Sequence, residues 1–215
     1  TVRLAAGVYN LTAPLAIGPN MSNVTFEPMG DGDVIISGGK RITGFEKTTF
    51  NGVECIGAFI PEVKDGSWKF TDLWVNGLHA DKTRLPKTGY FRMKETECDT
   101  TALYGHSSYF VAEEDDLKQF SSLYAFEDAI VSFNHYWIDE HTPLESYDPE
   151  TRRVTFKYRS RFNIDGGKNT SSGLEYCLEN IGEMFANPNE WYADEGKVYY
   201  IPRDESITPE TISGL

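Results

Sequence analysis

The chain consists of short apolar runs, each bounded by glycine, proline, asparagine or aspartate. Apolar residues at helical spacing are scarce, whereas short runs followed by a turn signal recur along the whole sequence. Runs bounded in this way are typical of β-strands rather than helices. The pattern therefore predicts a mainly β protein.

Residues 1–45 carry a faint internal repeat. Val2-Arg3-Leu4 is echoed by Val24-Thr25-Phe26, and Leu15-Ala16-Ile17 by Arg41-Ile42, at offsets of roughly 20 to 25 residues. Short strands at this interval fit the first coils of a parallel β-helix, and a sandwich edge with two hairpins is the competing interpretation. The residues predicted for the coil interior are Val2, Leu4, Leu11, Leu15, Ile17, Val24, Phe26, Ile35 and Ile42.

After Phe45 the apolar runs are longer and alternate more clearly. Asn76-Gly77 and Glu195-Gly196 predict two tight hairpins, and residues 129–138 predict a central strand because both of its faces are partly apolar. Apolar residues at roughly helical spacing predict one short helix near 178–185. Residues 46–205 are therefore predicted to form a largely antiparallel domain. Its predicted core includes Trp74, Val131, Phe133, Phe156, Tyr192 and Val198.

Charge and composition narrow the classes of partner and cofactor. The chain has 33 acidic and 20 basic residues, so its net charge of −13 argues against binding to nucleic acid. No apolar run is long enough for a membrane span. The chain has three cysteines but no Cys-x-x-Cys pair, and the spacing of His135 and His141 is not typical of metal ligands. We therefore predict neither a metal site nor another cofactor.

Two stretches resemble the signature motifs of a known group of enzymes. Residues 74–86 read WVNGLHADKTRLP, and residues 179–202 contain EN, NPNEWYAD and KVYYIP in that order. With AGVY at 6–9 and ISGG at 36–39, they are similar to large bacterial right-handed parallel β-helix glycoside hydrolases, of the β-xylosidase-like and α-fucosidase/xylanase-like families. Asn189 stands where those motifs usually have glycine, and Thr83 where they have alanine.

The resemblance implies a division of the chain and a location for catalysis. Residues 1–45 would begin a parallel β-helix, residues 46–205 would form an inserted β-sandwich-like or barrel-like domain, and residues 206–215 would return toward the helix. The catalytic carboxylates of these families belong to later coils, so no catalytic residue is expected in this chain. The chain is interpreted as a segment of a longer bacterial protein, which leaves secreted, periplasmic and cytoplasmic locations open.

Candidate chemistry within the chain is limited to acids and aromatic rings. Glycoside hydrolysis needs two carboxyl groups across one sugar ring, and Asp139-Glu140 is the best local pair. Neighbours on a strand point to opposite faces, which argues against this pair. Because sugars stack on flat rings, Trp68, Trp74, Trp137 and Trp191 are candidate contacts. The residues predicted to bind substrate are Arg84, His135, Trp137 and Trp191.

The sequence thus predicts a non-catalytic part of a carbohydrate-active β-helix protein. This part would cap the helix, shape the substrate cleft and meet an oligo- or polysaccharide through the longer protein, with homo-oligomerisation left open. A carbohydrate-binding or adhesion module is one alternative. A part of a polysaccharide lyase-like β-helix is another, although the acidic charge argues against an anionic polymer as substrate.

Overall fold

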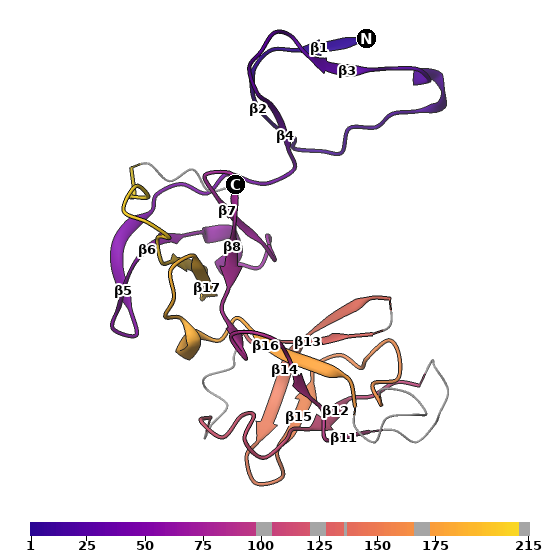
Figure 1. Cartoon of the computed structure of the whole chain (residues 1–215), viewed down its shortest axis with the longest axis vertical. Helices are drawn as coiled ribbons and strands as arrows, with labels where there is room; N and C mark the ends of the chain where they lie inside the picture. The colour runs from indigo at the N-terminus through magenta and orange to yellow at the C-terminus, as the bar shows by residue number, and fades with distance from the viewer. Residues whose placement is uncertain (98–104, 121–127, 136, 166–172, 211–215) are drawn as a thin grey trace.

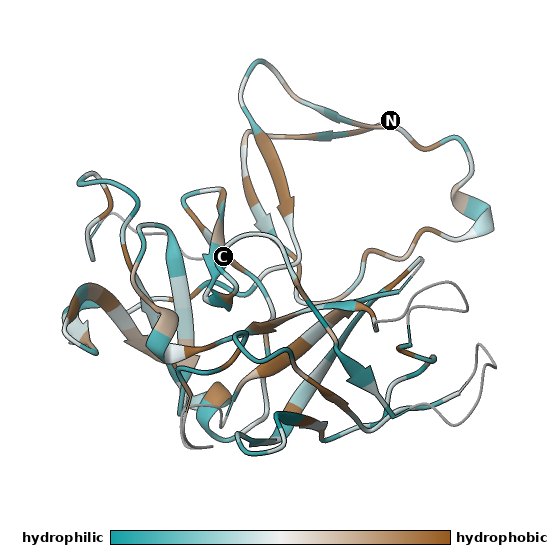
Figure 2. Cartoon of the chain, turned by 60° about the horizontal axis from the view of Figure 1, so that its bottom comes forward, coloured by the Kyte–Doolittle hydropathy of each residue, from teal (hydrophilic) through white to brown (hydrophobic). Residues whose placement is uncertain are grey.

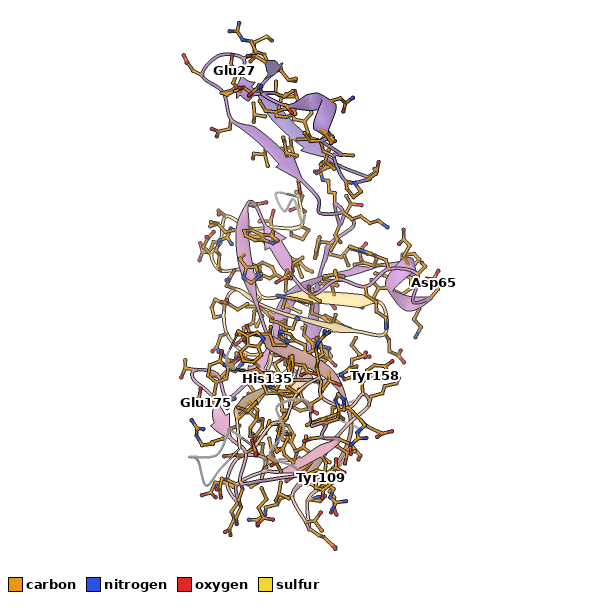
Figure 3. All side chains as sticks on the ribbon, turned by 90° about the vertical axis from the view of Figure 1, so that its right-hand side faces the viewer. Glu27, Asp65, Tyr109, His135, Tyr158 and Glu175 are labelled. Carbon is orange, nitrogen blue, oxygen red and sulfur yellow. The ribbon has the colours of Figure 1, made fainter. Side chains whose placement is uncertain are left out.

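The computed structural model places three β regions along the chain (Figure 1). It describes residues 1–97, 105–120, 128–135, 137–165 and 173–210. A layer of four short strands is followed by a six-stranded sheet and an eight-stranded sheet. Figure 3 shows these regions one after another, with Glu27 at one end and Tyr109 at the other.

The first region, which we call the N-terminal layer, contains two parallel strand pairs within residues 1–37. Strand β1 (Val2–Leu4) pairs with β3 (Phe26–Pro28), and β2 (Gly7–Asn10) pairs with β4 (Val34–Ser37). The parallel pairing predicted for this repeat is confirmed. The register differs by two residues, because Val2 lies opposite Phe26 rather than Val24. The 3₁₀ turn η1 (Pro19–Met21) lies between β2 and β3.

The interior predicted for the N-terminal layer is not enclosed. Val2, Phe26 and Ile35 are all exposed, as are Leu15 and Ile17. Figure 2 shows hydrophobic residues on these projecting strands. Two parallel strand pairs alone leave these side chains uncovered, because no further layer packs against them in the described structure. Ile42 is buried, but it packs in the core of the six-stranded sheet.

The six-stranded sheet joins segments from both ends of the predicted second domain. Its strand order is β5-β6-β18-β17-β8-β7, and its pairs are antiparallel except for β17 with β8. The bounds are β5 Glu46–Phe50, β6 Val53–Phe59, β7 Leu73–Val75, β8 Leu78–Lys82, β17 Glu190–Asp194 and β18 Lys197–Tyr200.

Both hairpins predicted in this sheet are confirmed. Asn76 and Gly77 connect β7 to β8 with φ values of 50° and 78°, and Glu195 and Gly196 connect β17 to β18 with φ values of 47° and 83°. Two successive positive φ values match the right-handed twist of the flanking strands.

The eight-stranded sheet lies between β8 and β17 in the sequence. Its order is β10-β16-β13-β14-β15-β12-β11, with β9 paired to β16, and neither large sheet closes on itself. The bounds are β9 Arg84–Leu85, β10 Phe91–Arg92, β11 Glu95–Thr96, β12 Tyr109–Val111, β13 Ile130–Asn134, β14 Asp139–Asp148, β15 Arg153–Phe156 and β16 Glu175–Glu179. Strand β13 pairs on both edges, which confirms the predicted central position. The bounds predicted for it, 129–138, are too long, because the chain turns after Asn134 and Asp139 already belongs to the neighbouring β14.

Three hydrophobic clusters fill these sheets. Val131, Phe133 and Phe156 are buried in the cluster of the eight-stranded sheet, and Val198 in that of the six-stranded sheet. Tyr192 belongs to a third, smaller cluster. The prediction that Trp74 is a core residue is wrong, because side chains alternate along β7. Leu73 and Val75 face the core, and the Trp74 residue is 45% exposed.

The predicted helix near 178–185 is also wrong. Residues up to Glu179 belong to β16, and only the 3₁₀ turn η3 (Gly182–Met184) follows. Pairing of β16 with β13 overrides the helical spacing of its apolar residues. The α-helix found in the described part of the chain is α1 (Pro61–Lys64). Among the described residues, no helix has the length and apolar character that crossing a membrane requires. The boundaries near residues 45 and 205 stay predictions.

Candidate functional site

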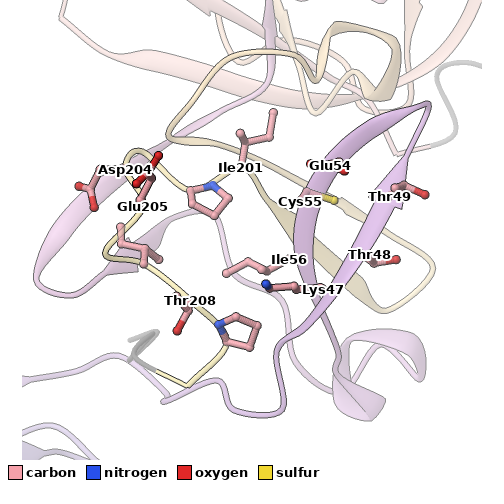
Figure 4. Close-up of a pocket in the computed structure, with 13 residues that line it drawn as sticks. Lys47, Thr48, Thr49, Glu54, Cys55, Ile56, Ile201, Asp204, Glu205 and Thr208 are labelled. Carbon is pink, nitrogen blue, oxygen red and sulfur yellow. The ribbon is translucent and has the colours of Figure 1, made fainter.

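A large open groove lies beside the β5–β6 ribbon. It has a volume of about 960 Å³ and is lined by that ribbon and by residues 201–209 (Figure 4). Lys47 and Glu54 face it from the ribbon, and Asp204, Glu205 and Thr208 come from the facing segment. Asp204 is already hydrogen-bonded to Ser206 within its own turn. None of the described residues that line the groove is aromatic, so they offer hydrogen bonds but no stacking surface for a sugar.

A polar cluster occupies the opposite side of the eight-stranded sheet from its core. Ser132 lies opposite His141 on β14, while Glu179 lies opposite Arg84 on β9. Residues directly opposite each other on antiparallel strands share a face. Ser132 Oγ lies 2.7 Å from His141 Nδ1 and donates to Glu179 Oε2 at 2.7 Å, and His141 Nδ1 lies 3.2 Å from the same carboxylate oxygen. We call Ser132, His141 and Glu179 the Glu179 cluster.

The electrostatics of this cluster favour charged side chains. Burial by itself would raise the pKa of Glu179, but hydrogen bonds from His141 and Ser132 and the charge of Lys82 lower it to about 2. The hydrogen bond to Glu179 raises the pKa of His141 in turn. A carboxyl group with a pKa near 2 is ionised at neutral pH and cannot act as a general acid there. Glu179 therefore serves as the charged partner of His141 and not as a proton donor.

The contacts of Ser132, His141 and Glu179 do not match those of a catalytic triad with a serine nucleophile. In a catalytic triad one imidazole nitrogen contacts the serine while the other contacts the acid. Here Nδ1 of His141 faces both Ser132 and Glu179. In the described part of the chain, no group of three potential metal-binding side chains is found.

The acidic pair Asp139-Glu140 is divided between two faces of β14. Glu140 Oε2 lies 2.9 Å from His135 Nε2, and its other oxygen accepts the backbone N–H of Arg161 at 2.8 Å. Asp139 alternates with Glu140 along the strand and lies opposite Asn134. Two carboxyl groups on opposite faces cannot bracket one sugar ring.

The four residues predicted to bind substrate fall into two separate pairs. Arg84 and Trp191 lie on neighbouring segments, because Thr83 N–H donates to Trp191 C=O at 2.9 Å. His135 and Trp137 lie at the turn between β13 and β14, where His135 N–H donates to Ile138 C=O. The structure places the four residues at two separate positions and does not unite them.

The four residues predicted to bind substrate differ in how far their side chains are exposed to solvent. Trp191 is 2% exposed and stacks on Phe70 with ring centroids 5.3 Å apart. The His135 side chain is 5% exposed against Glu140, whereas Trp137 is exposed beside Phe162. Arg84 donates to Gly89 C=O at 2.6 Å and lies over the ring of Tyr90. Their predicted contact with saccharide stays a prediction.

The motifs that carried the family resemblance hold the sheets together. Asn180 has a φ of 57°, donates to Ala193 C=O and accepts from Ala193 N–H, which ties the end of β16 to β17. Asn189 has a φ of 72°, which explains why asparagine can replace glycine there. Glu190, only 6% exposed, accepts the N–H groups of Ala186 and Asn187 and pairs with Lys87 at 2.6 Å.

Comparison with known proteins identifies a fold. No family model and no curated protein matches the sequence. A solved structure described as "Glycoside hydrolase" matches 99% of the chain with a TM-score of 0.66 and 21% sequence identity. The match covers 37% of that structure's own chain. The chain therefore has a glycoside hydrolase-like fold, shared with about a third of a longer protein.

Proposed function

We propose that this chain is a non-catalytic part of a longer carbohydrate-active protein. In this proposal the N-terminal layer begins a right-handed parallel β-helix that continues in the longer protein. The two large sheets form a unit inserted into that helix. They cap it and form one wall of the cleft that receives an oligo- or polysaccharide. The fold match to a solved glycoside hydrolase supports this assignment.

The observation that carries the proposal is the uncovered apolar surface of the parallel strands. Val8 of β2 and Ile35 of β4 lie directly opposite each other, so their side chains share a face, and they are 53% and 46% exposed. Apolar side chains on ordered strands favour burial at roughly 25 cal/mol per Å². A further coil stacked on this layer would cover them, as neighbouring coils do in a solenoid.

Three candidate carboxyl groups, those of Asp139, Glu140 and Glu179, support a non-catalytic role. A glycosidase needs one carboxylic acid that stays protonated and a second carboxylate across the sugar ring. Glu179 is held ionised by its partners, and Asp139 and Glu140 lie on opposite faces of one strand. The proposal accordingly places the catalytic acids in the longer protein, outside this chain.

Activity assays on two lengths of the protein test the proposal. Residues 1–215 and the longer protein should be incubated with aryl xylosides, fucosides, arabinosides and galactosides. We expect hydrolysis by the longer protein alone. Turnover by residues 1–215 that disappears in Glu179→Gln or Asp139→Ala would overturn the non-catalytic assignment, and a longer protein inactive on all four would overturn the hydrolase assignment.

A further inference from the structure

An aromatic cleft separate from the Glu179 cluster opens where the N-terminal layer meets the six-stranded sheet. Two adjoining cavities of about 310 and 410 Å³ share Gly38, Gly39 and Trp74 in their linings. The first continues past Asp72 and the ring of Trp68, and the second continues along β4. The first cavity, which the β4 isoleucines do not line, is by itself within the size range of small-molecule sites.

Trp74 presents an anchored but open ring to this cleft. Its neighbours on β7, Leu73 and Val75, are fully buried, so the strand that carries it is fixed in the core. The Trp74 ring contacts His79 edge-on, with ring centroids 5.1 Å apart and an interplanar angle of 70°. An indole held in this way offers a flat apolar surface at little cost in side-chain entropy, which suits the C–H face of a sugar ring.

Polar groups lie beside the same ring. Asp72 Oδ1 is 3.2 Å from His79 Nε2, and Asp72 Oδ2 accepts the hydroxyl of Thr71 at 2.6 Å. The Asp72 side chain is still 59% exposed, so its oxygens can accept further hydrogen bonds. A carboxylate at the edge of an aromatic ring can accept two neighbouring hydroxyl groups of a pyranose while the ring stacks below.

Glycines leave the cleft unobstructed. A Cβ atom added at Gly38 or Gly77 would meet no atom within 4 Å, so both positions face open space. Both glycines line the second cavity. Without side chains there, a ring of sugar size can approach the backbone beside Trp74.

The charges around the cleft select for an uncharged ligand. Asp72 contributes a negative charge, and the nearby cation of Lys40 is paired with Glu62 at 2.6 Å. The chain as a whole carries a charge of −13, which disfavours uronates and phosphates. A purely apolar ligand would strip water from Asp72 and His79 without replacing their hydrogen bonds.

We infer that Trp74, Asp72 and His79 form a saccharide subsite for one neutral pyranose unit of an oligosaccharide. Trp74 stacks on the apolar face of the sugar, and Asp72 accepts its hydroxyl protons with His79 as a further hydrogen-bonding group. The inference rests on the proposed carbohydrate-active function and specifies where this chain contacts the saccharide.

Calorimetry of residues 1–215 with xylohexaose, arabinohexaose and galactohexaose tests the subsite. We expect at least one of them to bind, and Trp74→Ala to weaken that binding by about 10-fold or more. Trp74→Phe should retain part of the affinity because it keeps a ring. Asp72→Asn should weaken binding less than Trp74→Ala. Tyr158→Ala, which removes an exposed ring in the segment after β15, should leave the affinity unchanged.

The outcomes separate this inference from the proposed function. Unchanged binding in Trp74→Ala would overturn the subsite while leaving a carbohydrate-binding chain. Absence of binding to all three probes would also overturn it, and hydrolysis by the longer protein would then decide the proposed function by itself. If Trp74→Ala instead lowers the melting temperature of the longer protein and changes no affinity, the ring packs against a later coil and the subsite is wrong. Circular dichroism of each variant checks that it is folded.

Discussion

The N-terminal layer and the eight-stranded sheet are both ordered by backbone hydrogen bonds, yet they differ in what their side chains do. In β4 the isoleucine side chains are largely exposed, whereas Val131 and Phe133 of β13 are fully buried. Strand β4 pairs with one neighbour in the described structure, and β13 pairs with two. A backbone hydrogen bond contributes only about 1 kcal/mol net, while a buried large apolar side chain contributes about 1.5–3 kcal/mol. Backbone pairing can therefore order the strands of the N-terminal layer, but stabilising that layer would require its apolar side chains to be packed against another element.

Removal of a buried ring should show the largest contrast between the two regions. Phe133 packs against Phe156 with ring centroids 5.5 Å apart, so Phe133→Ala leaves a cavity in the core. We expect a loss of about 3–5 kcal/mol in the free energy of unfolding, measured by urea denaturation. Tyr158→Ala, which changes an exposed residue just after β15, is the control and should alter the free energy of unfolding little. A loss below about 1 kcal/mol for Phe133→Ala would show that this core is loosely packed.

The second-largest loss of stability is expected from breaking the ion pair between Glu190 and Lys87. Glu190→Gln removes the charge that Lys87 faces and places an amide nitrogen against backbone N–H donors. We expect a loss of about 2–3 kcal/mol by urea denaturation, since an uncompensated charge remains partly buried. The matched control is Glu27→Gln in the N-terminal layer, where the pair with Arg3 is exposed and should matter by less than about 0.5 kcal/mol. Equal losses would contradict the contrast between the regions.

The Glu179 cluster should make stability depend on pH in a defined window. The pKa of Glu179 is lowered from 4.5 to about 2, so its stabilising effect is present above pH 4.5 and is lost as the pH falls toward 2. The pKa of His141 is raised above 6.5, so its contribution is present below pH 6.5 and is lost as the pH rises through its folded-state value. Stability from the pair is therefore greatest between about pH 4.5 and 6.5.

Denaturation at several pH values checks this window with Glu179→Gln. The wild-type chain should lose on the order of 1–3 kcal/mol more than the variant between pH 4.5 and 2.5. Glu175 lies on the same strand as Glu179 and forms an exposed ion pair with Arg92 of β10. Glu175→Gln should therefore show the same pH dependence of stability as the wild type. Parallel curves for wild type and Glu179→Gln would show that Glu179 is not held ionised by its partners.

Of the substitutions considered, one in the N-terminal layer should change the free energy of unfolding of the 215-residue chain least. Ile35→Ala removes an exposed side chain and should change the free energy of unfolding by less than about 0.5 kcal/mol. The same substitution in the longer protein should cost about 2 kcal/mol or more, because a following coil would bury the residue. Equal, small effects in both proteins would mean that nothing covers this surface.

Several features of the fold could be predicted because they depend on neighbouring residues. The hairpins at Asn76-Gly77 and Glu195-Gly196 need positive φ at two successive positions, and the sequence supplies residues that tolerate it. The parallel repeat in residues 1–37 could be read from similar short strands at a regular interval. The central position of β13 followed from apolar residues on both faces.

The candidate sites were predictable only in part. Arg84 could be singled out from its motif, but its position opposite Glu179 depends on the register of β9 with β16. Ser132 and His141 meet Glu179 because β13 lies between β14 and β16. Trp74 was one of four tryptophans, and its exposure beside Asp72 depends on which face of β7 meets the core.

Adjacent residues were therefore enough to predict the β-rich class, the tight hairpins and the repeat of short strands in residues 1–37, whose parallel pairing the structure then showed. Tertiary structure decided that residues 175–179 form a strand, that β8 pairs in parallel with β17, and which polar side chains meet. Turn conformation and strand propensity are local, so a few adjacent residues specify them. Register and burial are set by contacts between segments up to about a hundred residues apart, and the free energy of packing those segments outweighs local preference.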